Sequence, residues 1–230
     1  MDIKIVLSNI AETTEAFNVS GLSLNSKTLT KGDLFIALQG EKNHGAEYID
    51  SAIENGCIGV LIEGRDVDCG VPIIRIDNLK PHLSGLAQNF YTKAKDVDLI
   101  AVTGTNGKTS VSHYISQLLD FLEVNNGVIG TLGISKVEKK SVNTTPDIFS
   151  IFSSLDEYSS QGIKLAIIEA SSHALMQDRL EGLSFIQGIF TNLTQDHLDY
   201  HETMGNYKEA KGKLFTNGFS KKAIINRDDE

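Results

Sequence analysis

The sequence predicts an α/β protein whose larger part is a mainly parallel, doubly wound sheet. Two observations carry this prediction. From about residue 99 onward, apolar strand-like segments alternate with helical patterns, and such alternation is typical of a parallel sheet covered by helices on both faces. Residues 101–110 read AVTGTNGKTS, an apolar segment that enters a glycine-containing loop ahead of a helical pattern. The strand segments are continuously apolar, as strands buried on both faces are.

The first part of the chain predicts a small α/β domain over 1–92. We expect strands at 33–38, 58–63 and 72–76, and helices at 46–56 and 79–90, where Pro81 fits the first helical turn. The polar segment 92–98 is the expected boundary.

The second predicted domain covers 93–230. Its expected strands begin at 99, 164, 185 and 222, and its expected helices lie near 111–122 and 203–215. Sheets of this kind bind ligands at the carboxyl ends of their strands. The polar clusters that follow these strands are therefore the candidate site.

The loop at 104–110 is predicted to bind phosphate. Gly104 and Gly107 permit a close backbone approach, Lys108 is placed to reach the β- and γ-phosphates, and the Thr109 hydroxyl is placed to hold Mg²⁺. The G-x-x-x-x-G-K-[ST] form would have glycine at Val102. The alternative is an ordinary glycine turn before a core helix, which the strand–loop–helix context disfavours. The predicted nucleotide cradle is Gly104, Thr105, Asn106, Gly107, Lys108, Thr109 and Ser110.

Composition limits the classes of partner. The 230 residues are 40% hydrophobic and 22% charged, with a formal net charge of −9, so there is no basic stripe of the kind that binds nucleic acid. Two cysteines, Cys57 and Cys69, without a C-x-x-C pattern indicate reduced thiols. No signal peptide or membrane span is evident. We expect a soluble, cytoplasmic monomer with neither nucleic acid nor membrane as partner.

An acid and two histidines follow predicted strands. Glu169 comes directly after LAII, where an acid commonly serves Mg²⁺ in phosphate-loop proteins; the alternative is a helix cap or a partner for a lysine. His197 and His201 are four residues apart, as zinc ligands can be, but H-E-x-x-H and a third ligand are absent. We favour a place for His197 near metal or phosphate.

Residue chemistry alone leaves alternative roles for three further positions. Lys211 in NYKEAKGKLF is interpreted as a solvated lysine on a charged helix face. The turn NTTPD at 143–147 either binds a ligand or caps the helix after it. Arg179 is suited to grip a carboxylate or phosphate, although a surface ion pair is the commoner fate of an arginine.

Taken together, these segments resemble the Mur ligases, the ATP-dependent enzymes that build the peptide stem of bacterial cell-wall precursors. The resemblance covers nearly the whole chain and is closest to the MurE type. It is carried by GTNGKTS, NTTPD, EASSHALMQDRL, TNLTQDHLDYHETM and YKEAKGKLF, in the family's order and spacing. The resemblance implies a small UDP-precursor-binding domain at 1–92, followed by a central ATP-binding domain at 93–230.

The resemblance also implies roles for individual residues. Lys108 and Thr109 would hold ATP and Mg²⁺, and Glu169 and His197 resemble the family's magnesium ligands. Lys211 matches the lysine that CO₂ converts to an anionic carbamate, which reverses the solvated interpretation. The implied catalytic residues are Lys108, Glu169, His197 and Lys211, and the implied metal ligands are Thr109, Glu169, His197 and Lys211.

The implied substrate contacts fall in both domains. Those for the muramoyl-peptide are Asn143, Thr144, Thr145, Ser171, Gln177 and Arg179, and those for the uridine nucleotide are Leu24, Ser26, Glu41, Lys42 and Asn43. The chain departs from the family pattern at three places. Asn25-Ser26-Lys27 replaces Asp-Ser-Arg, Ala101 replaces a frequent glycine, and Asp178 stands where glycine is common.

The implied reaction adds diaminopimelate or lysine to UDP-N-acetylmuramoyl-L-alanyl-D-glutamate through an acyl phosphate formed with ATP. The resemblance further implies that the chain ends inside the central domain and lacks the C-terminal domain that binds the amino acid. We therefore expect the 230-residue chain not to turn over by itself. The competing hypotheses are a binding module without catalysis and a folate- or amino-acid-polymerising relative, which the SSHAL and NTTPD segments disfavour.

Overall fold

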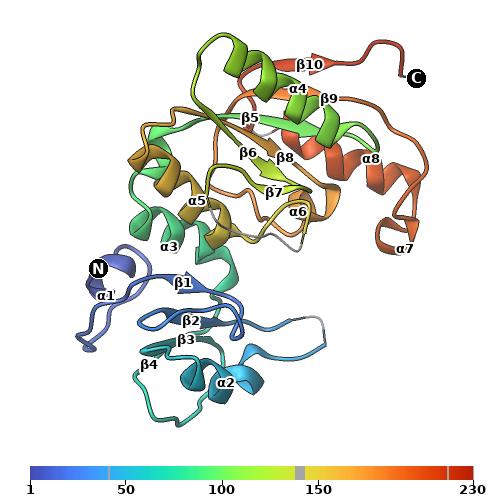
Figure 1. Ribbon diagram of the computed structural model, residues 1–230. Coiled ribbons are helices and arrows are strands. Elements are labelled where there is room, and N and C mark those ends of the chain that lie inside the picture. Colours follow the sequence, from blue (N-terminus) through green and yellow to red (C-terminus); the bar gives the residue numbers. More distant parts are fainter. Residues whose placement is uncertain (41, 138–142, 217, 230) are drawn as a thin grey trace. The chain divides into compact units, whose positions relative to one another are not determined.

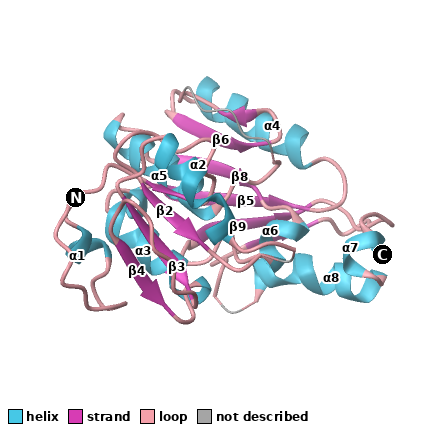
Figure 2. Ribbon diagram, turned by 90° about the horizontal axis from the view of Figure 1, so that it is seen from below, coloured by secondary structure: helices cyan, strands magenta, loops and turns pink. Residues whose placement is uncertain are grey.

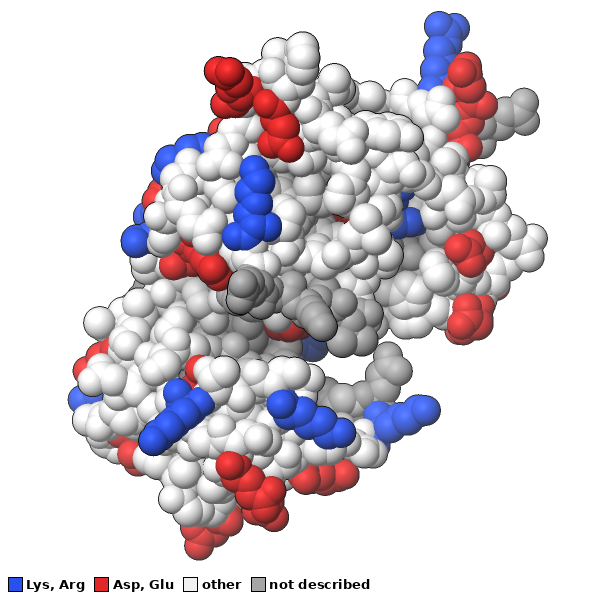
Figure 3. Space-filling view, viewed as in Figure 1, with Lys and Arg blue, Asp and Glu red and all other residues white. Residues whose placement is uncertain are grey.

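The computed structural model describes residues 1–40, 42–137, 143–216 and 218–229. The chain folds into two compact units, Met1–Thr92 and Lys93–Glu230, and each is described by itself (Figure 1). Within the described residues, no helix combines the length and the apolar character needed to cross a membrane. On the face shown in Figure 3, acidic and basic side chains lie in small separate groups.

The first unit contains a sheet of four parallel strands in the order β1-β2-β3-β4. These strands are β1 (Leu22–Ser23), β2 (Leu34–Ala37), β3 (Gly59–Glu63) and β4 (Ile73–Ile76). The helices are α1 (Ile3–Val6), α2 (Ile49–Glu54) and α3 (Leu83–Phe90), with 3-10 turns at Gly45–Tyr48 and Lys80–His82 that lead into α2 and α3. The helices expected at 46–56 and 79–90 thus both begin as 3-10 turns.

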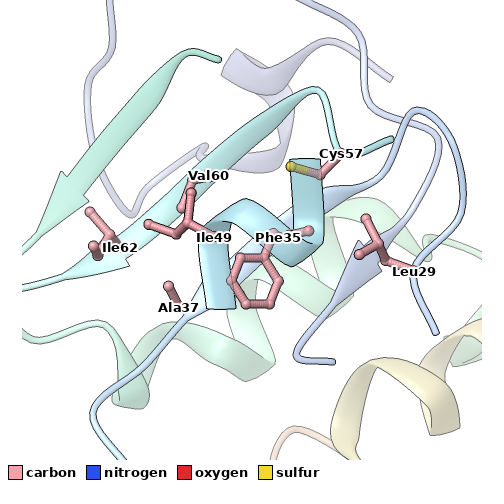
Figure 4. Packing of buried hydrophobic residues seen from close by; sticks show 8 residues of the cluster. Leu29, Phe35, Ala37, Ile49, Cys57, Val60 and Ile62 are labelled. Atoms are coloured by element: carbon pink, nitrogen blue, oxygen red, sulfur yellow. The ribbon is translucent and has the colours of Figure 1, made fainter. Parts of the chain in front are cut away.

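Apolar side chains from β2, β3 and α2 form one core of this unit (Figure 4). Phe35 and Ala37 on β2 lie on the same side of the strand as Val60 and Ile62 on β3, because alternate residues point to one face. Ile49 from α2 covers them, and Cys57 lies buried in the same cluster. Glu63, at the end of β3, accepts hydrogen bonds from the backbone N–H groups of Gln39 and Leu79, at 3.0 and 2.9 Å. The carboxylate thus holds two loops at this end of the sheet.

The second unit contains a six-stranded sheet in the order β10-β9-β5-β8-β6-β7, parallel except for β7. Figure 2 shows β6, β8, β5 and β9 side by side in this order. The strands are β5 (Asp98–Thr103), β6 (Asn126–Gly130), β7 (Gly133–Ile134), β8 (Leu165–Glu169), β9 (Phe185–Phe190) and β10 (Ala223–Ile225). This confirms the predicted fold class. Because Val102 pairs with Glu169 and Thr103 with Phe190, the segments after β5, β8 and β9 emerge together.

Helices flank this sheet and continue from its loops. They are α4 (Lys108–Phe121), α5 (Ile148–Ser160), α6 (Ser172–Met176), α7 (Leu198–His201) and α8 (Met204–Gly212), which a 3-10 turn extends over Lys213–Phe215. Helix α4 packs with Val111, Ile115 and Leu119 against Val102 and Ile167 of the sheet. The sequence patterns assigned no element to β6, β7, α6 or α7, and they indicated α5 only as a helix that NTTPD might cap.

Tyr158 of α5 joins this helix to the sheet. Its ring is fully buried, and its hydroxyl donates to the carbonyl oxygens of Val128 and Ser135, at 3.2 and 2.7 Å. Burial raises the pKa of Tyr158 to about 12, so the hydroxyl keeps its proton and stays a donor.

We expect Tyr158→Phe to lower the free energy of unfolding by about 1–2 kcal/mol, because buried carbonyls lose a donor while the ring still fills its space. Chemical denaturation measures the change. Tyr114→Phe is the matched control, since this tyrosine of α4 is 64% exposed and should change stability by less than about 0.5 kcal/mol. Equal effects of the two substitutions would contradict this account of Tyr158.

Candidate functional site

The loop between β5 and α4 has the geometry of an anion cradle. Gly107 is the N-cap of α4 in the left-handed region, with φ +84°. Lys108, Thr109 and Ser110 form the first helical turn, where backbone N–H groups have no partner within the helix. These groups and the positive end of the helix favour an anion such as phosphate.

Glycine is required at the start of this loop. Gly104 has φ +142°, and a Cβ at this position would collide with the hydroxyl of Thr191, which follows β9. The loop is therefore packed directly against the segment after the neighbouring strand. Ala101, where the family often has glycine, is fully buried within β5 and accommodated there.

Lys108 turns back over the loop. Its Nζ donates to the carbonyl oxygens of Gly104 and Thr105, at 2.9 and 2.8 Å. Burial lowers the pKa of Lys108, while the nearby carboxylates of Glu169 and Asp196 act in the opposite direction. The ammonium therefore lies at the loop and is attracted by two nearby carboxylates.

Glu169 ends β8 and is fully buried. Its carboxylate accepts hydrogen bonds from the Thr109 hydroxyl at 2.9 Å and from the backbone N–H and hydroxyl of Thr131, at 3.0 and 2.9 Å. These donors are neutral and come from the phosphate loop and the turn after β6, so Glu169 is neither a helix cap nor hydrogen-bonded to a lysine here. Thr131 was missed by our sequence reading, because a lone threonine in an exposed turn carries no signal.

Lys211 of α8 is buried, with 2% of its surface exposed. The solvated interpretation from residue chemistry alone is therefore wrong. Its Nζ donates to the Gly104 carbonyl at 2.8 Å and lies 4.4 Å from the centre of the Tyr207 ring. Burial, and secondarily the charge of Lys108, lower the pKa of Lys211 to about 7.

Tyr207 was also missed by the sequence reading. It is almost fully buried, and its hydroxyl donates to the Thr105 hydroxyl at 3.2 Å. One turn of α8 thus supplies both this contact and Lys211 to the phosphate loop. The role of Tyr207 follows from its burial on a helix that is rich in charged residues. That burial cannot be recognised from the sequence.

Three histidines gather beside this helix. The ring of His173 lies 4.9 Å from that of His197 and 5.5 Å from that of His201, measured between centroids. His197 is the left-handed N-cap of α7, and its Nε2 is 3.6 Å from a carboxylate oxygen of Asp196. Burial lowers the pKa of both His173 and His201.

The zinc alternative for His197 and His201 finds no support. Instead of turning toward a shared ligand position, the His201 ring lies 2.9 Å from the Ser172 hydroxyl. In the part of the chain that the structure describes, no three or more His, Cys, Asp or Glu side chains are grouped to hold a metal. Thr109 and Glu169 are in direct contact, whereas His197 and Lys211 are related through Tyr207, whose ring centroid lies 6.2 Å from that of His197.

The turn at 143–147 joins the end of β8. Thr145 is buried, and its hydroxyl donates to the Glu169 carbonyl at 2.6 Å and lies 3.1 Å from the Ser171 hydroxyl. The Thr144 hydroxyl lies 3.2 Å from the Thr131 hydroxyl. Asp147 caps α5 by accepting from two backbone N–H groups. The turn therefore does cap the following helix, and it also brings its threonines to the Glu169 end of the sheet.

Arg179 is held beside this turn. Its guanidinium donates to the Thr145 carbonyl at 2.7 Å and to the side-chain oxygen of Gln177 at 3.0 Å. Burial lowers its pKa. Asp178, where glycine is common in the family, has φ +57°, which explains that preference. Asp178 adopts this left-handed conformation with its Cβ, and Arg179 reaches Thr145.

The residues expected to contact uridine lie in the first unit. Ser26 is 5% exposed, Leu24 follows β1, and the Asn43 carbonyl accepts from Gly40 N–H at 3.0 Å. Lys42 is exposed, and Glu41 lies outside the described residues. This loop is anchored by the buried ring of His44, which accepts from the N–H of Ala46 and bonds the Glu63 carbonyl, both at 2.9 Å.

Comparison with known proteins assigns both units to one family. Residues 102–230 match the family model "Mur ligase middle domain", and residues 18–91 match "Mur ligase family, catalytic domain". A protein of Wigglesworthia glossinidia brevipalpis, named UDP-N-acetylmuramoyl-L-alanyl-D-glutamate--2,6-diaminopimelate ligase, is 38% identical over 98% of this chain and 48% of its own length. The chain spans about half the length of the curated relatives it matches.

Solved structures of Mur ligases resemble this chain as well. A structure titled with the same ligase name superposes with a TM-score of 0.79 and 31% identity, over 100% of this chain and 47% of that one. The MurF ligase of Thermotoga maritima in complex with ADP superposes with a TM-score of 0.61, over 91% of this chain and 46% of its own. At 21% identity, this second likeness concerns the fold alone.

The depressed pKa of Lys211 predicts how stability changes with pH. In the folded protein the amine releases its proton near pH 7, whereas the unfolded chain keeps it to about 10.5. Between these values unfolding takes up a proton, so the folded state gains up to about 1.4 kcal/mol per pH unit as pH rises. Lys211→Met should remove this gain.

We therefore expect the native chain to become more stable than Lys211→Met as pH rises from about 7 to 9. Below about pH 7, the difference between their free energies of unfolding should stay constant. Chemical denaturation in CO₂-free buffer measures it. Lys213→Met, on the same helical segment, is the control. Parallel pH profiles for the native chain and Lys211→Met would refute the assignment.

Proposed function

The chain belongs to the Mur ligase family, and from this membership we propose its function. It contributes to ATP-dependent amide-bond formation that adds an amino acid to UDP-N-acetylmuramoyl-L-alanyl-D-glutamate in peptidoglycan synthesis. The relatives' names favour diaminopimelate as the added amine over lysine. The free thiols of Cys57 and Cys69 support the cytoplasm as the compartment.

One observation carries this proposal: the Thr109 hydroxyl of the phosphate loop bonds the buried Glu169 carboxylate at 2.9 Å. A threonine hydroxyl and an acid at a strand end are the protein ligands that phosphate-loop enzymes offer to Mg²⁺. The donor set fits the ion, since Mg²⁺ takes one or two carboxylates and completes its shell with water and substrate phosphate. We assign His197 and carbamylated Lys211 as further ligands. Bound there, Mg²⁺ would neutralise charge on the phosphates.

The residues of the chain have distinct tasks in the proposed reaction. Lys108 leaves the carbonyls of Gly104 and Thr105 to hold the β- and γ-phosphates, and the N–H groups at the start of α4 bind phosphate oxygens. The side-chain carboxylate of the D-glutamyl residue attacks the γ-phosphorus, giving an acyl phosphate and ADP. The incoming amine then attacks the acyl carbon and loses a proton, and inorganic phosphate departs as the amide forms.

The muramoyl-peptide is proposed to bind where the turn at 143–147 meets α6. Arg179 is directed at this place by Thr145 and Gln177, and its planar donors suit a carboxylate. Asn143, Thr144 and Ser171 supply the remaining polar groups of the proposal. The uridine nucleotide is assigned to the first unit, with Leu24, Ser26, Lys42, Asn43 and Glu41, the last outside the described residues.

The peptide assignment is tested by calorimetric titration with UDP-N-acetylmuramoyl-L-alanyl-D-glutamate. We expect saturable binding that Arg179→Ala weakens about tenfold or more, because a charge-assisted contact is lost. The control is Arg75→Ala, which removes an exposed arginine paired with Asp66 and Asp77. Binding of ATP without the muramoyl-peptide would favour a nucleotide-binding module or a folate-polymerising relative.

Carbamylation of Lys211 is a separate proposal. A neutral amine is the form that reacts with CO₂, and burial supplies it near pH 7. We expect ¹³C-labelled bicarbonate to give one carbamate signal in the NMR spectrum, stronger above about pH 7. Lys211→Arg should abolish the signal and Lys213→Arg should retain it. A signal that survives in Lys211→Arg would rule this lysine out.

A further inference from the structure

The segment Thr191–Thr194, which follows β9, is hydrogen-bonded along the first half of the phosphate loop. The side-chain oxygen of Asn192 accepts from the N–H of Asn106 at 2.9 Å, and its carbonyl accepts from the N–H of Thr105 at 2.8 Å. The Thr105 hydroxyl accepts from Thr194 N–H at 3.0 Å and donates to the Thr194 carbonyl at 3.1 Å. The Asn106 carbonyl also accepts from the Thr191 hydroxyl at 2.6 Å and from the side-chain amide of Asn192 at 3.1 Å. These bonds fix the loop to the neighbouring segment.

These bonds divide the loop into two halves. The N–H groups of Thr105 and Asn106 are engaged by Asn192, whereas those of Lys108, Thr109 and Ser110 lie in the first turn of α4. The N–H groups of Lys108, Thr109 and Ser110 are therefore placed to meet a phosphate. The direction in which they point depends on the first half staying attached to Thr191–Thr194.

Two side chains beyond β10 hold this segment from the other side. The N–H of Leu193 donates to both carboxylate oxygens of Asp229, at 3.1 and 2.9 Å. The side-chain amide of Asn226 donates to the Thr191 carbonyl at 2.8 Å. An ionised acceptor makes the stronger kind of hydrogen bond, so Asp229 is the principal contact to the middle of the segment.

We propose that Asp229 is a positioning residue for nucleotide binding. Its carboxylate fixes the backbone of Leu193, the adjacent Asn192 holds Thr105 and Asn106, and the loop then presents its remaining N–H groups to the triphosphate. The inference rests on the proposed function, because it takes the loop's ligand to be ATP. Asp229 itself does not touch the nucleotide in this account.

A purely structural role for Asp229 makes different predictions. If the carboxylate only secured the end of β10, its loss would not reach Thr105 and Asn106, and its effect would not depend on Asn192. The positioning role requires both. Amide exchange at the loop and a double-mutant cycle with Asn192 therefore distinguish the two roles.

The test begins with Asp229→Ala in the 230-residue chain. We expect faster hydrogen exchange at the amides of Thr105 and Asn106 in the ligand-free protein, and an affinity for MgATP about tenfold lower, since a charge-assisted hydrogen bond is lost. Binding of UDP to the first unit should not change. Asp229→Asn, which keeps one acceptor oxygen, should lose less. Asp228→Ala, an exposed neighbour, is the matched control.

The double-mutant cycle completes the test. In the Asn192→Ala background, Asp229→Ala should lower MgATP affinity less than it does in the native chain, because the side-chain bonds from residue 192 to Asn106 are already lost and only its backbone carbonyl still holds Thr105. Additive losses, or unchanged exchange at Thr105 and Asn106, would overturn the proposal, as would faster exchange with unchanged affinity. If exchange rises but the native chain binds no MgATP, the proposed function fails and the nucleotide role of Asp229 with it, while the contact route itself stands.

Discussion

The carbonyl oxygen of Gly104 is the point on which the site depends. It accepts from two lysines, Lys108 at 2.9 Å and Lys211 at 2.8 Å. Burial lowers the pKa of both lysines; the charge of Lys108 lowers that of Lys211 further, whereas Glu169 and Asp196 oppose the shift of Lys108. The close approach of α8 and the phosphate loop therefore maintains a buried amine that loses its proton near neutral pH.

The Gly104 carbonyl lies where the polar segments that follow several strands meet. Parallel pairing of β5 with β8 and β9 brings the phosphate loop, Glu169 and Thr191 to one edge of the sheet. Glu169 is held by neutral donors from Thr109 and Thr131, so its charge is left to meet a cation supplied with the ligand. The lysines lie on the α8 side of the loop and the acid on the Thr109 side. A triphosphate with its metal would meet both signs of charge.

Local sequence patterns predicted much of the fold, but they could not indicate contacts between residues that are far apart in the sequence. The buried strands β2, β3, β5 and β8 follow from short apolar runs, and the phosphate loop from its glycines and Lys-Thr pair. Helix α5 contains five serines and two phenylalanines, which blur a helical pattern. Lys211 lies 107 residues from the carbonyl it bonds, so its own neighbourhood indicated a solvated lysine. Only resemblance to a family corrected that interpretation, and Tyr207, Thr131 and Asp229 had no such support.

The shared carbonyl also constrains how the site can change. If Lys108 moved to a phosphate as proposed, Gly104 would keep the bond from Lys211, so this oxygen would not be left without a donor. If Lys211 carried the proposed carbamate, its Nζ would keep one N–H but lose its positive charge, so its hydrogen bond to Gly104 would be weaker. Both proposed changes together would leave Gly104 with this single, weaker donor. The proposed carbamylation and the proposed movement of Lys108 would therefore be energetically coupled through one backbone oxygen.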